Sequence, residues 1–117
     1  MMNREKTKKE VYTFVEMTSD HQGWILPKDD EFLDDLVEGL KSNWNRFGYF
    51  HCPCRAATGD RKKDEDVICP CLDYCLPDIE EYGQCYCGLY LNKDFYKEHK
   101  KPVQIPERRP EELDPFS

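Results

Sequence analysis

The sequence predicts a small, mainly α-helical domain with one irregular region that cysteines hold together. Its length of 117 residues suits a single domain. Apolar residues recur at helical spacing before residue 48, and all seven cysteines lie in residues 51–89, "HCPCRAATGDRKKDEDVICPCLDYCLPDIEEYGQCYCGL". We therefore expect about five short helices around the cysteine region. Residues 1–117 form one domain in this interpretation, and residues 102–117 are its extended C-terminal tail.

Two amphipathic helices are predicted before the cysteine region. The first covers residues 5–18, where apolar side chains recur every three to four positions. The second begins at Asp29 or Asp30, either of which can cap it, and ends at Gly48. We interpret its continuous apolar stripe as core: Leu33, Leu36, Val37, Leu40, Trp44 and Phe47. Gly39 lies on the other face, at a cost of about 1 kcal/mol relative to alanine.

Three shorter helical segments are predicted farther along the chain: residues 59–68 with Asp60 as cap, one turn between Pro77 and Gly83, and residues 93–101. Residues 21–27, "HQGWILP", form a connector in this interpretation, and residues 86–92 are too short to assign. From Pro102 onward the chain contains four prolines, which favours an extended tail wrapped on the surface.

Composition excludes several classes of function. The formal net charge of −7 argues against a nucleic-acid partner. The basic runs at Arg4–Lys9 and at 61–63 are typical of solvated helix faces. No apolar run approaches the roughly 18 residues that cross a bilayer, and the charged N-terminus does not resemble a signal peptide. We therefore expect a cytoplasmic protein without a membrane partner. In a reducing compartment, an odd number of clustered cysteines favours metal or redox chemistry over a disulfide framework.

Six of the cysteines form three Cys-x-Cys pairs, and Cys75 is single: Cys52/Cys54, Cys69/Cys71 and Cys85/Cys87. In an extended chain, side chains at i and i+2 point the same way. Structural zinc sites usually place two to four residues between paired ligands, so this spacing suits a tetrahedral zinc site poorly. It suits a polynuclear cluster better, because neighbouring cysteines can bind different metal atoms of one core.

The number of cysteines is also informative. A [4Fe-4S] cluster takes four thiolates, and two of the remaining three cysteines can then form a dithiol/disulfide pair beside it. Such an arrangement has a chemical purpose, because a disulfide takes up two electrons whereas iron–sulfur donors deliver one at a time. Pro53 and Pro70, inside the first two pairs, fix φ near −65° and hold the sulfurs at a defined separation.

The three pairs resemble a known family. The order "CPCR", "CPC" and Cys-x-Cys followed by "GLYL", after the helical "FLDDLVEGL", is similar to the catalytic subunit of ferredoxin:thioredoxin reductase and to single-chain ferredoxin-dependent disulfide reductases. The resemblance runs from about residue 10 to about residue 100. It implies a mainly α-helical domain around a [4Fe-4S] cluster. It also implies ferredoxin, or a rubredoxin-like protein, as electron donor and a thioredoxin-like protein disulfide as substrate.

The resemblance also implies a role for each paired cysteine. The cluster ligands would be Cys52, Cys69, Cys71 and Cys85. Cys54 and Cys87 would form the redox-active disulfide, with Cys54 as the nucleophile that attacks the substrate. Each outer pair would then supply one sulfur to the cluster and one to the disulfide.

This sequence departs from the family pattern at two places. Tyr86 occupies the position of a histidine that assists proton transfer in the family, and a phenol with a pKa near 10 is a poorer shuttle than an imidazole near 6.5. His51 is a candidate substitute, although a lone histidine is more often a packing residue. The segment between Cys71 and Cys85 is longer than in the photosynthetic enzyme. We interpret its Cys75 as a buried or spare thiol, and the alternative is a substitute ligand or a second redox thiol.

Basic residues after the first pair carry two further expectations. Arg55 beside Cys54 would lower the pKa of that thiol. Because ferredoxins are acidic, as this chain is, donor docking needs a positive patch, for which the candidates are Arg55, Arg61, Lys62 and Lys63. Two other functions remain open at this stage: a zinc-binding interaction module, and a cluster-based redox sensor that regulates another protein.

Overall fold

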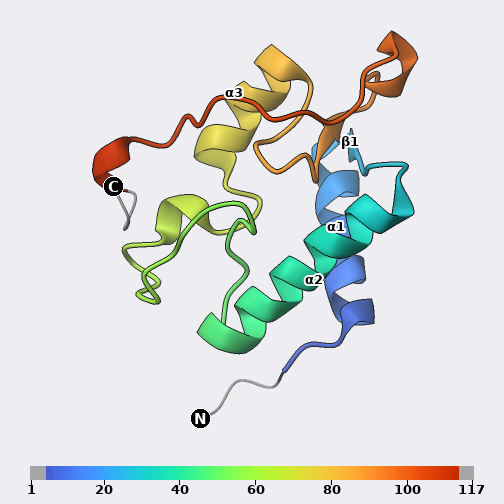
Figure 1. Cartoon of the computed structure of the whole chain (residues 1–117). Coiled ribbons are helices and arrows are strands. Elements are labelled where there is room, and N and C mark those ends of the chain that lie inside the picture. The colour runs from blue at the N-terminus through green and yellow to red at the C-terminus, as the bar shows by residue number, and fades with distance from the viewer. Residues whose placement is uncertain (1–4, 114–117) are drawn as a thin grey trace.

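The computed structural model describes residues 5–113, which form a mainly helical, cysteine-rich domain (Figure 1). These residues contain three α-helices, a two-stranded sheet and three short 3-10 helices. In chain order the elements are α1 (Lys8–Gln22), β1 (Trp24–Ile25), α2 (Asp30–Phe47), the 3-10 turn Glu65–Val67, α3 (Leu72–Tyr82), β2 (Leu91–Asn92), and the 3-10 turns Tyr96–Glu98 and Glu111–Leu113. The helical class agrees with the sequence, whereas three α-helices and single turns stand in place of the five helices expected.

The first helix begins later and ends later than predicted. Thr7 caps α1 in a reciprocal capping box with Glu10, so the helix starts at Lys8. It continues to Gln22, where Gly23 adopts the left-handed conformation with φ 75°. Val11 and Val15 are completely buried, as the apolar spacing predicts.

The second helix agrees closely with the prediction. Asp29 accepts hydrogen bonds from the first backbone N–H groups of α2, and Gly48 ends the helix with φ 82°. The central residues of its apolar stripe are buried in the core. Gly39 has a reason that the sequence did not reveal: a Cβ there would lie 2.9 Å from Cβ of Pro53. The glycine therefore lets α2 pack directly on the first cysteine pair.

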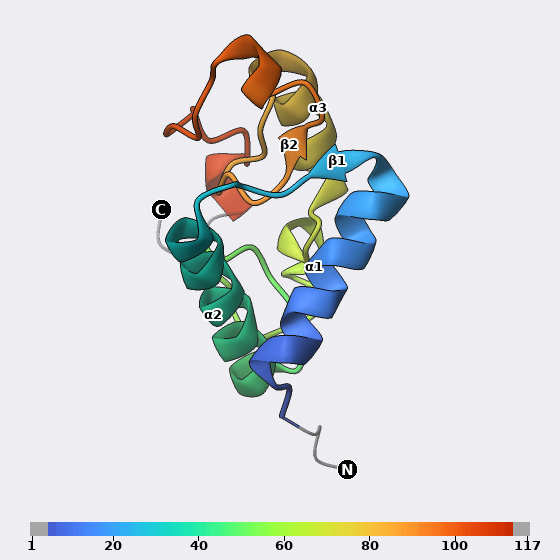
Figure 2. The same cartoon turned by 90° about the vertical axis from the view of Figure 1, so that its right-hand side faces the viewer.

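A small sheet closes the space between the first two helices and the end of the cysteine region. α1 and α2 lie side by side, and β1 connects them at one end (Figure 2). β1 pairs antiparallel with β2, with Trp24 opposite Asn92 and Ile25 opposite Leu91. The only strands in residues 5–113 therefore lie in the connector (21–27) and in the stretch that the sequence left unassigned (86–92). Each strand is too short to produce an alternating pattern of apolar and polar residues.

The segment between the first two cysteine pairs is a loop and not the predicted helix. Its buried Asp64 accepts hydrogen bonds from Tyr49, Thr58 and Gly59. Burial alone would raise the pKa of Asp64, but the hydrogen bonds from Thr58 and Tyr49 outweigh it and lower that pKa. These hydrogen bonds hold the chain in turns, and within this segment only Glu65–Val67 is helical. The arrangement leaves the basic side chains of residues 61–63 exposed.

Two other predicted helices also differ from the structure. α3 begins at Leu72 and includes Pro77, so it starts before the single turn that the sequence predicted and ends at Gly83 as expected. The predicted helix at 93–101 is a single 3-10 turn, Tyr96–Glu98. Its neighbour Phe95 is buried, and this packing fixes the chain locally without a longer helix.

The chain from Pro102 to Leu113 runs over the outside of α3 and the cysteine region as a strap (Figure 1). Within this strap Ile105 is buried, and Arg108 forms ion pairs with Asp78 and Glu81 of α3. Arg4 and residues 114–117, which belong to the predicted basic run and tail, lie outside the described residues. Within 5–113, no helix has the length and apolar character needed to traverse a bilayer.

Candidate functional site

All three Cys-x-Cys pairs lie in turns closed by a backbone hydrogen bond. The N–H of Arg55 donates to the carbonyl of Cys52 (3.1 Å), and the N–H of Gly88 donates to that of Cys85 (2.9 Å). In the middle pair, the N–H of Cys71 donates to the carbonyl of Ile68 (2.6 Å). The sequence interpretation assumed an extended chain at each Cys-x-Cys pair, and this assumption is wrong. A turn changes the backbone direction between the two sulfurs, so they need not face the same way.

The outer pairs each divide into a buried cysteine and a more accessible one. Cys52 and Cys85 are 3% and 2% exposed, whereas Cys54 is exposed and Cys87 is half-buried. All seven cysteines are free thiols in this structure. The first cysteine of each outer pair thus faces the interior, and the second faces a groove at the surface.

The inner sulfurs have hydrogen-bond donors directed at them. The backbone N–H of Tyr90 donates to Sγ of Cys85 (3.3 Å), and the Tyr90 hydroxyl lies 3.3 Å from Sγ of Cys69. Burial raises the pKa of the Tyr90 phenol, so it keeps its proton and can donate. Nη1 of Arg55 donates to Sγ of Cys71 (3.4 Å). Such donors stabilise negative charge on sulfur.

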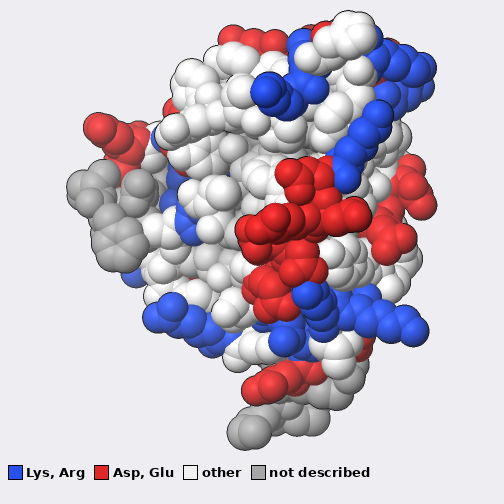
Figure 3. Space-filling model, turned by 45° about the vertical axis from the view of Figure 1, so that its right-hand side comes forward, with Lys and Arg blue, Asp and Glu red and all other residues white. Residues whose placement is uncertain are grey.

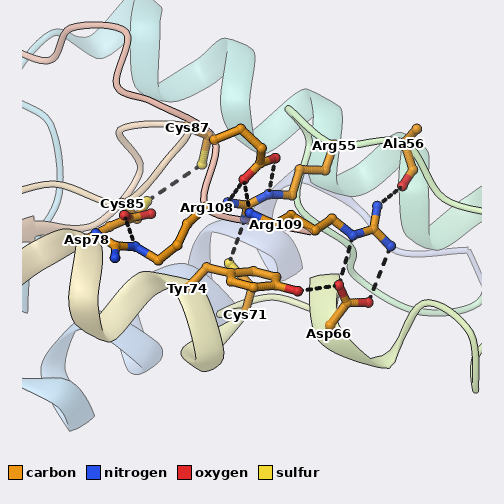
Figure 4. Close-up of polar contacts among 11 residues, drawn as sticks. Arg55, Ala56, Asp66, Cys71, Tyr74, Asp78, Cys85, Cys87, Arg108 and Arg109 are labelled. Carbon is orange, nitrogen blue, oxygen red and sulfur yellow. Dashed lines mark hydrogen bonds and ion pairs between the residues drawn. The ribbon is translucent and has the colours of Figure 1, made fainter. Parts of the chain in front are cut away.

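Arg55 is a buried part of the site and not a docking residue. Figure 4 shows Arg55 beside Cys71, to which it donates. Its guanidinium also forms a bidentate pair with Glu107 of the strap, at 2.8 and 2.7 Å. It lies between the rings of Tyr74 and Tyr86, 4.8 and 4.5 Å from their centroids. With a side chain only 2% exposed, Arg55 cannot belong to the predicted surface patch. Its charge acts on the sulfurs instead.

The accessible sulfurs open onto a groove of about 360 Å³. Its lining is contributed by four segments far apart in the sequence: Phe32 of α2, Cys54 of the first pair, Gln84, Tyr86 and Cys87 around the last pair, and Pro102, Val103 and Gln104 of the strap. A hydrogen bond with the Cys87 side chain lowers the pKa of Cys54, and Arg55 contributes in the same direction. Sγ of Cys87 also lies 3.7 Å from Sγ of Cys85. Cys87 therefore contacts both the groove and the interior.

Cys75 lies among the inner sulfurs. It is completely buried on α3, as the sequence interpretation expected. The neighbouring Cys85 side chain and burial both raise the pKa of the Cys75 thiol. We therefore describe it as a protonated thiol next to Cys85.

His51 does not replace the family histidine. It is buried against the rings of Phe47 and Tyr49, and its Nδ1 lies 3.0 Å from the carbonyl of Cys52. It does not line the groove, which Tyr86 does. The packing interpretation of His51 is the correct one. Burial raises the pKa of Tyr86, so this phenol is protonated at neutral pH.

The residues present fit an iron–sulfur cluster in the chemistry of their donors. The set implied by the resemblance (Cys52, Cys69, Cys71 and Cys85) consists of thiols, and three of them meet the donors of Tyr90 or Arg55. Hydrogen bonds to sulfur and nearby positive charge are the features that stabilise cluster thiolates. No group of three or more His, Cys, Asp or Glu side chains in residues 5–113 has a geometry that would hold a metal ion.

Several residues of the site were not predicted from the sequence. Glu107 contacts Arg55 across 52 residues, and Tyr90 and Gln84 become site residues only because their segments fold against the cysteines. No local pattern marks these residues.

Comparison with models of known protein families gives a match over most of the chain. Residues 2–111 match the model described as ferredoxin thioredoxin reductase catalytic beta chain. The match includes every cysteine and most of the strap. A comparison with curated proteins finds no match.

Proposed function

The chain belongs to the ferredoxin thioredoxin reductase catalytic beta chain family, and on this basis we propose that it reduces protein disulfides with electrons from ferredoxin or a similar small redox protein. The family consists of oxidoreductase chains. The observation that supports the proposal best is the division of the outer pairs. Cys54 and Cys87 share one surface groove, while Cys52 and Cys85, two residues before them, are buried, as are Cys71 and Cys75.

In this proposal four inner cysteines bind a [4Fe-4S] cluster: Cys52, Cys69, Cys71 and Cys85. When bound, the cluster supplies electrons one at a time to a disulfide that needs two. The protein's contribution is to bury three of these four cysteines, to donate hydrogen bonds from Tyr90 and to place the charge of Arg55 beside Cys71.

The groove cysteines perform the exchange with substrate. The Cys54 thiolate attacks one sulfur of the substrate disulfide, forming a mixed disulfide and releasing the other substrate sulfur, which takes a proton. Hydrogen bonds with Cys52 and with its other cysteine neighbours, together with burial, raise the pKa of Cys87, so it starts as a thiol. Cys87 then loses its proton and attacks Sγ of Cys54, the second substrate sulfur takes up a proton and leaves as a thiol, and a Cys54–Cys87 disulfide remains. Two electrons from the donor and two protons return this disulfide to the dithiol. The lowered pKa of Cys54 favours the thiolate that starts the exchange.

Proton delivery differs from the family pattern in this proposal. Tyr86 lines the groove but stays protonated, so its phenol does not exchange protons readily at neutral pH. Cys54 is exposed, and water in the groove therefore supplies the protons that the departing thiolates require.

The surface charge suggests where the donor binds. One face of the molecule has a central band of Asp and Glu with groups of Lys and Arg on either side (Figure 3). An acidic ferredoxin needs a positive surface. We assign its docking to Arg61, Lys62 and Lys63, which are exposed on the loop between the first and middle pairs. A thioredoxin-like substrate would bind at the groove, whose lining does not include these three residues.

The experiment that tests the function is anaerobic purification followed by metal analysis and turnover. We expect a brown protein with about four irons per chain and absorbance near 400 nm, which reduces an oxidised thioredoxin when reduced ferredoxin is supplied. One zinc per chain without visible absorbance would instead establish the zinc-binding module. A protein that holds the iron but reduces no protein disulfide would establish the redox sensor.

A further inference from the structure

One wall of the groove beside Cys54 and Cys87 comes from the C-terminal strap. Pro102, Val103 and Gln104 line it, together with residues of the cysteine region. The volume of about 360 Å³ lies near the lower end of the roughly 300–1,000 Å³ found for ligand pockets. The groove can therefore hold a few side chains next to the two sulfurs.

The wall is fixed by one buried side chain. Nε2 of Gln84 donates to the carbonyl of Val103 (2.8 Å), and Oε1 of Gln84 accepts from the N–H of Val103 (2.9 Å). Gln84 also donates to the carbonyl of Cys85 (3.2 Å), so the strap is tied to the turn that contains Cys87. Ile105, two residues later, is buried and anchors the strap a second time.

The backbone of Gln104 lies between these two anchors and is unused. In the part of the chain that the structure describes, its N–H and C=O form no hydrogen bond. The prolines at 102 and 106 favour an extended chain here, because each fixes its own φ and the second restricts Ile105. Consecutive residues of an extended chain direct their polar groups to opposite sides. The groups of Gln104 therefore point away from Gln84, as at an open sheet edge.

We propose that Gln104 pairs through its backbone with an extended segment of the substrate protein, next to the substrate cysteine. The N–H of Gln104 would donate to a substrate carbonyl, and its C=O would accept from a substrate N–H, as in β-strand addition. Side chains of the segment fill the groove, and its disulfide meets Cys54. This inference rests on the proposed function. It makes the preferred substrate an extended polypeptide with an exposed disulfide, and it disfavours small disulfides.

Two variants of the intact holoprotein test the pairing. Gln104→Pro removes the N–H donor, and Gln104→Ala changes only the side chain and serves as the matched control. With reduced methyl viologen as donor, each variant reduces a short disulfide-linked peptide dimer or bis(2-hydroxyethyl) disulfide, which has no peptide backbone. Binding is measured separately, by fluorescence anisotropy of the labelled peptide with serine in place of cysteine.

We expect Gln104→Pro to raise both KM and Kd for the peptide about tenfold, because a lost hydrogen bond of ordinary strength has this effect. Gln104→Ala should change neither by more than about twofold. The two variants should share the same kcat for the peptide and the same constants for the small disulfide, because both lack the Gln104 side chain and only the proline variant also lacks the N–H. Methylating the peptide's backbone nitrogen next to the cysteine should weaken binding to the wild-type protein about tenfold, so the test does not depend on the folding of the proline variant.

Equal peptide affinities for the proline and alanine variants, with undiminished binding of the methylated peptide, would overturn the pairing. That result leaves turnover, and hence the proposed function, intact. Conversely, peptide binding that depends on the Gln104 N–H without reduction of either disulfide would support the pairing and contradict the reductase function.

Discussion

The outer and the middle cysteine pairs have the same spacing but different places in their turns. In the outer pairs the cysteines occupy the first and third positions, Cys52 and Cys54 in one turn and Cys85 and Cys87 in the other. In the middle pair the turn begins one residue earlier, at Ile68, so Cys69 and Cys71 occupy the second and fourth positions. The outer pairs place one sulfur inside and one in the groove, whereas both sulfurs of the middle pair lie away from the groove.

The spacing of a Cys-x-Cys pair therefore does not by itself determine which of its sulfurs is buried and which lies in the groove. The shift of one position in the turn changes which side chains point toward the core. Cys71 also adopts a left-handed conformation, with φ 45°, at the start of α3, a conformation that costs a non-glycine residue roughly 1–2 kcal/mol. The surrounding contacts of the middle turn, including the hydrogen bond from Arg55 to Cys71, compensate this cost.

The largest effects are expected when the inner sulfur and the groove sulfur of the last pair are removed one at a time. Cys85→Ser should lose iron and visible absorbance, because it removes an inner ligand. Cys87→Ser should keep its iron but reduce protein disulfides more slowly by on the order of a thousandfold or more, because mixed disulfides are no longer resolved. Iron analysis, absorbance and thioredoxin reduction measure both variants. If both variants lost iron equally, Cys85 and Cys87 would not have the separate roles of cluster ligand and exchange cysteine that we propose.

A second substitution tests how Arg55 is held beside the inner sulfur of Cys71. Glu107→Gln leaves a buried guanidinium without its carboxylate, and we expect a loss of about 2 kcal/mol in the free energy of unfolding. The value is below that for a fully buried pair because the Glu107 side chain is 33% exposed.

The matched control is Glu98→Gln, which removes the same charge from an exposed pair with Lys100 and should cost at most about 1 kcal/mol. Urea denaturation of both variants gives the two values. Identical denaturation midpoints would mean that Glu107 contributes nothing to holding Arg55 over Cys71.

The smallest expected effect concerns the loop that connects the first and middle pairs. Replacing Arg61, Lys62 and Lys63 by glutamine should slow ferredoxin-driven reduction several-fold at low ionic strength. The difference should fade above about 0.1 M salt, where the Debye length shortens to about 10 Å. The control is the exposed triple Lys93→Gln, Lys97→Gln and Lys101→Gln. If both triples give the wild-type rate in dilute buffer, the donor docks elsewhere.

Local signals in the sequence were sufficient for the first two helices and for the identity of the chemical groups. The apolar stripe of α2, its cap at Asp29 and its end at Gly48 depend on neighbours within a few residues. The same holds for the three cysteine pairs, whose order along the chain is enough to indicate the family. The shorter segments were predicted less well. Asp64 accepts hydrogen bonds from Thr58 and from Tyr49, which lies 15 residues before it, and these bonds hold a loop where the local pattern favoured a helix.

What the sequence determined by itself is a set of thiols at fixed spacing on a helical domain. The tertiary structure alone decided which of them are buried, which share a groove, and that Arg55 belongs to the core with Glu107 and not to the surface. The physical reason is that burial and charge pairing are properties of the packed chain. The strap reaches Arg55 from 52 residues away, and Gln84 reaches Val103 from 19 residues away. Neither contact leaves a periodic trace in the amino-acid sequence.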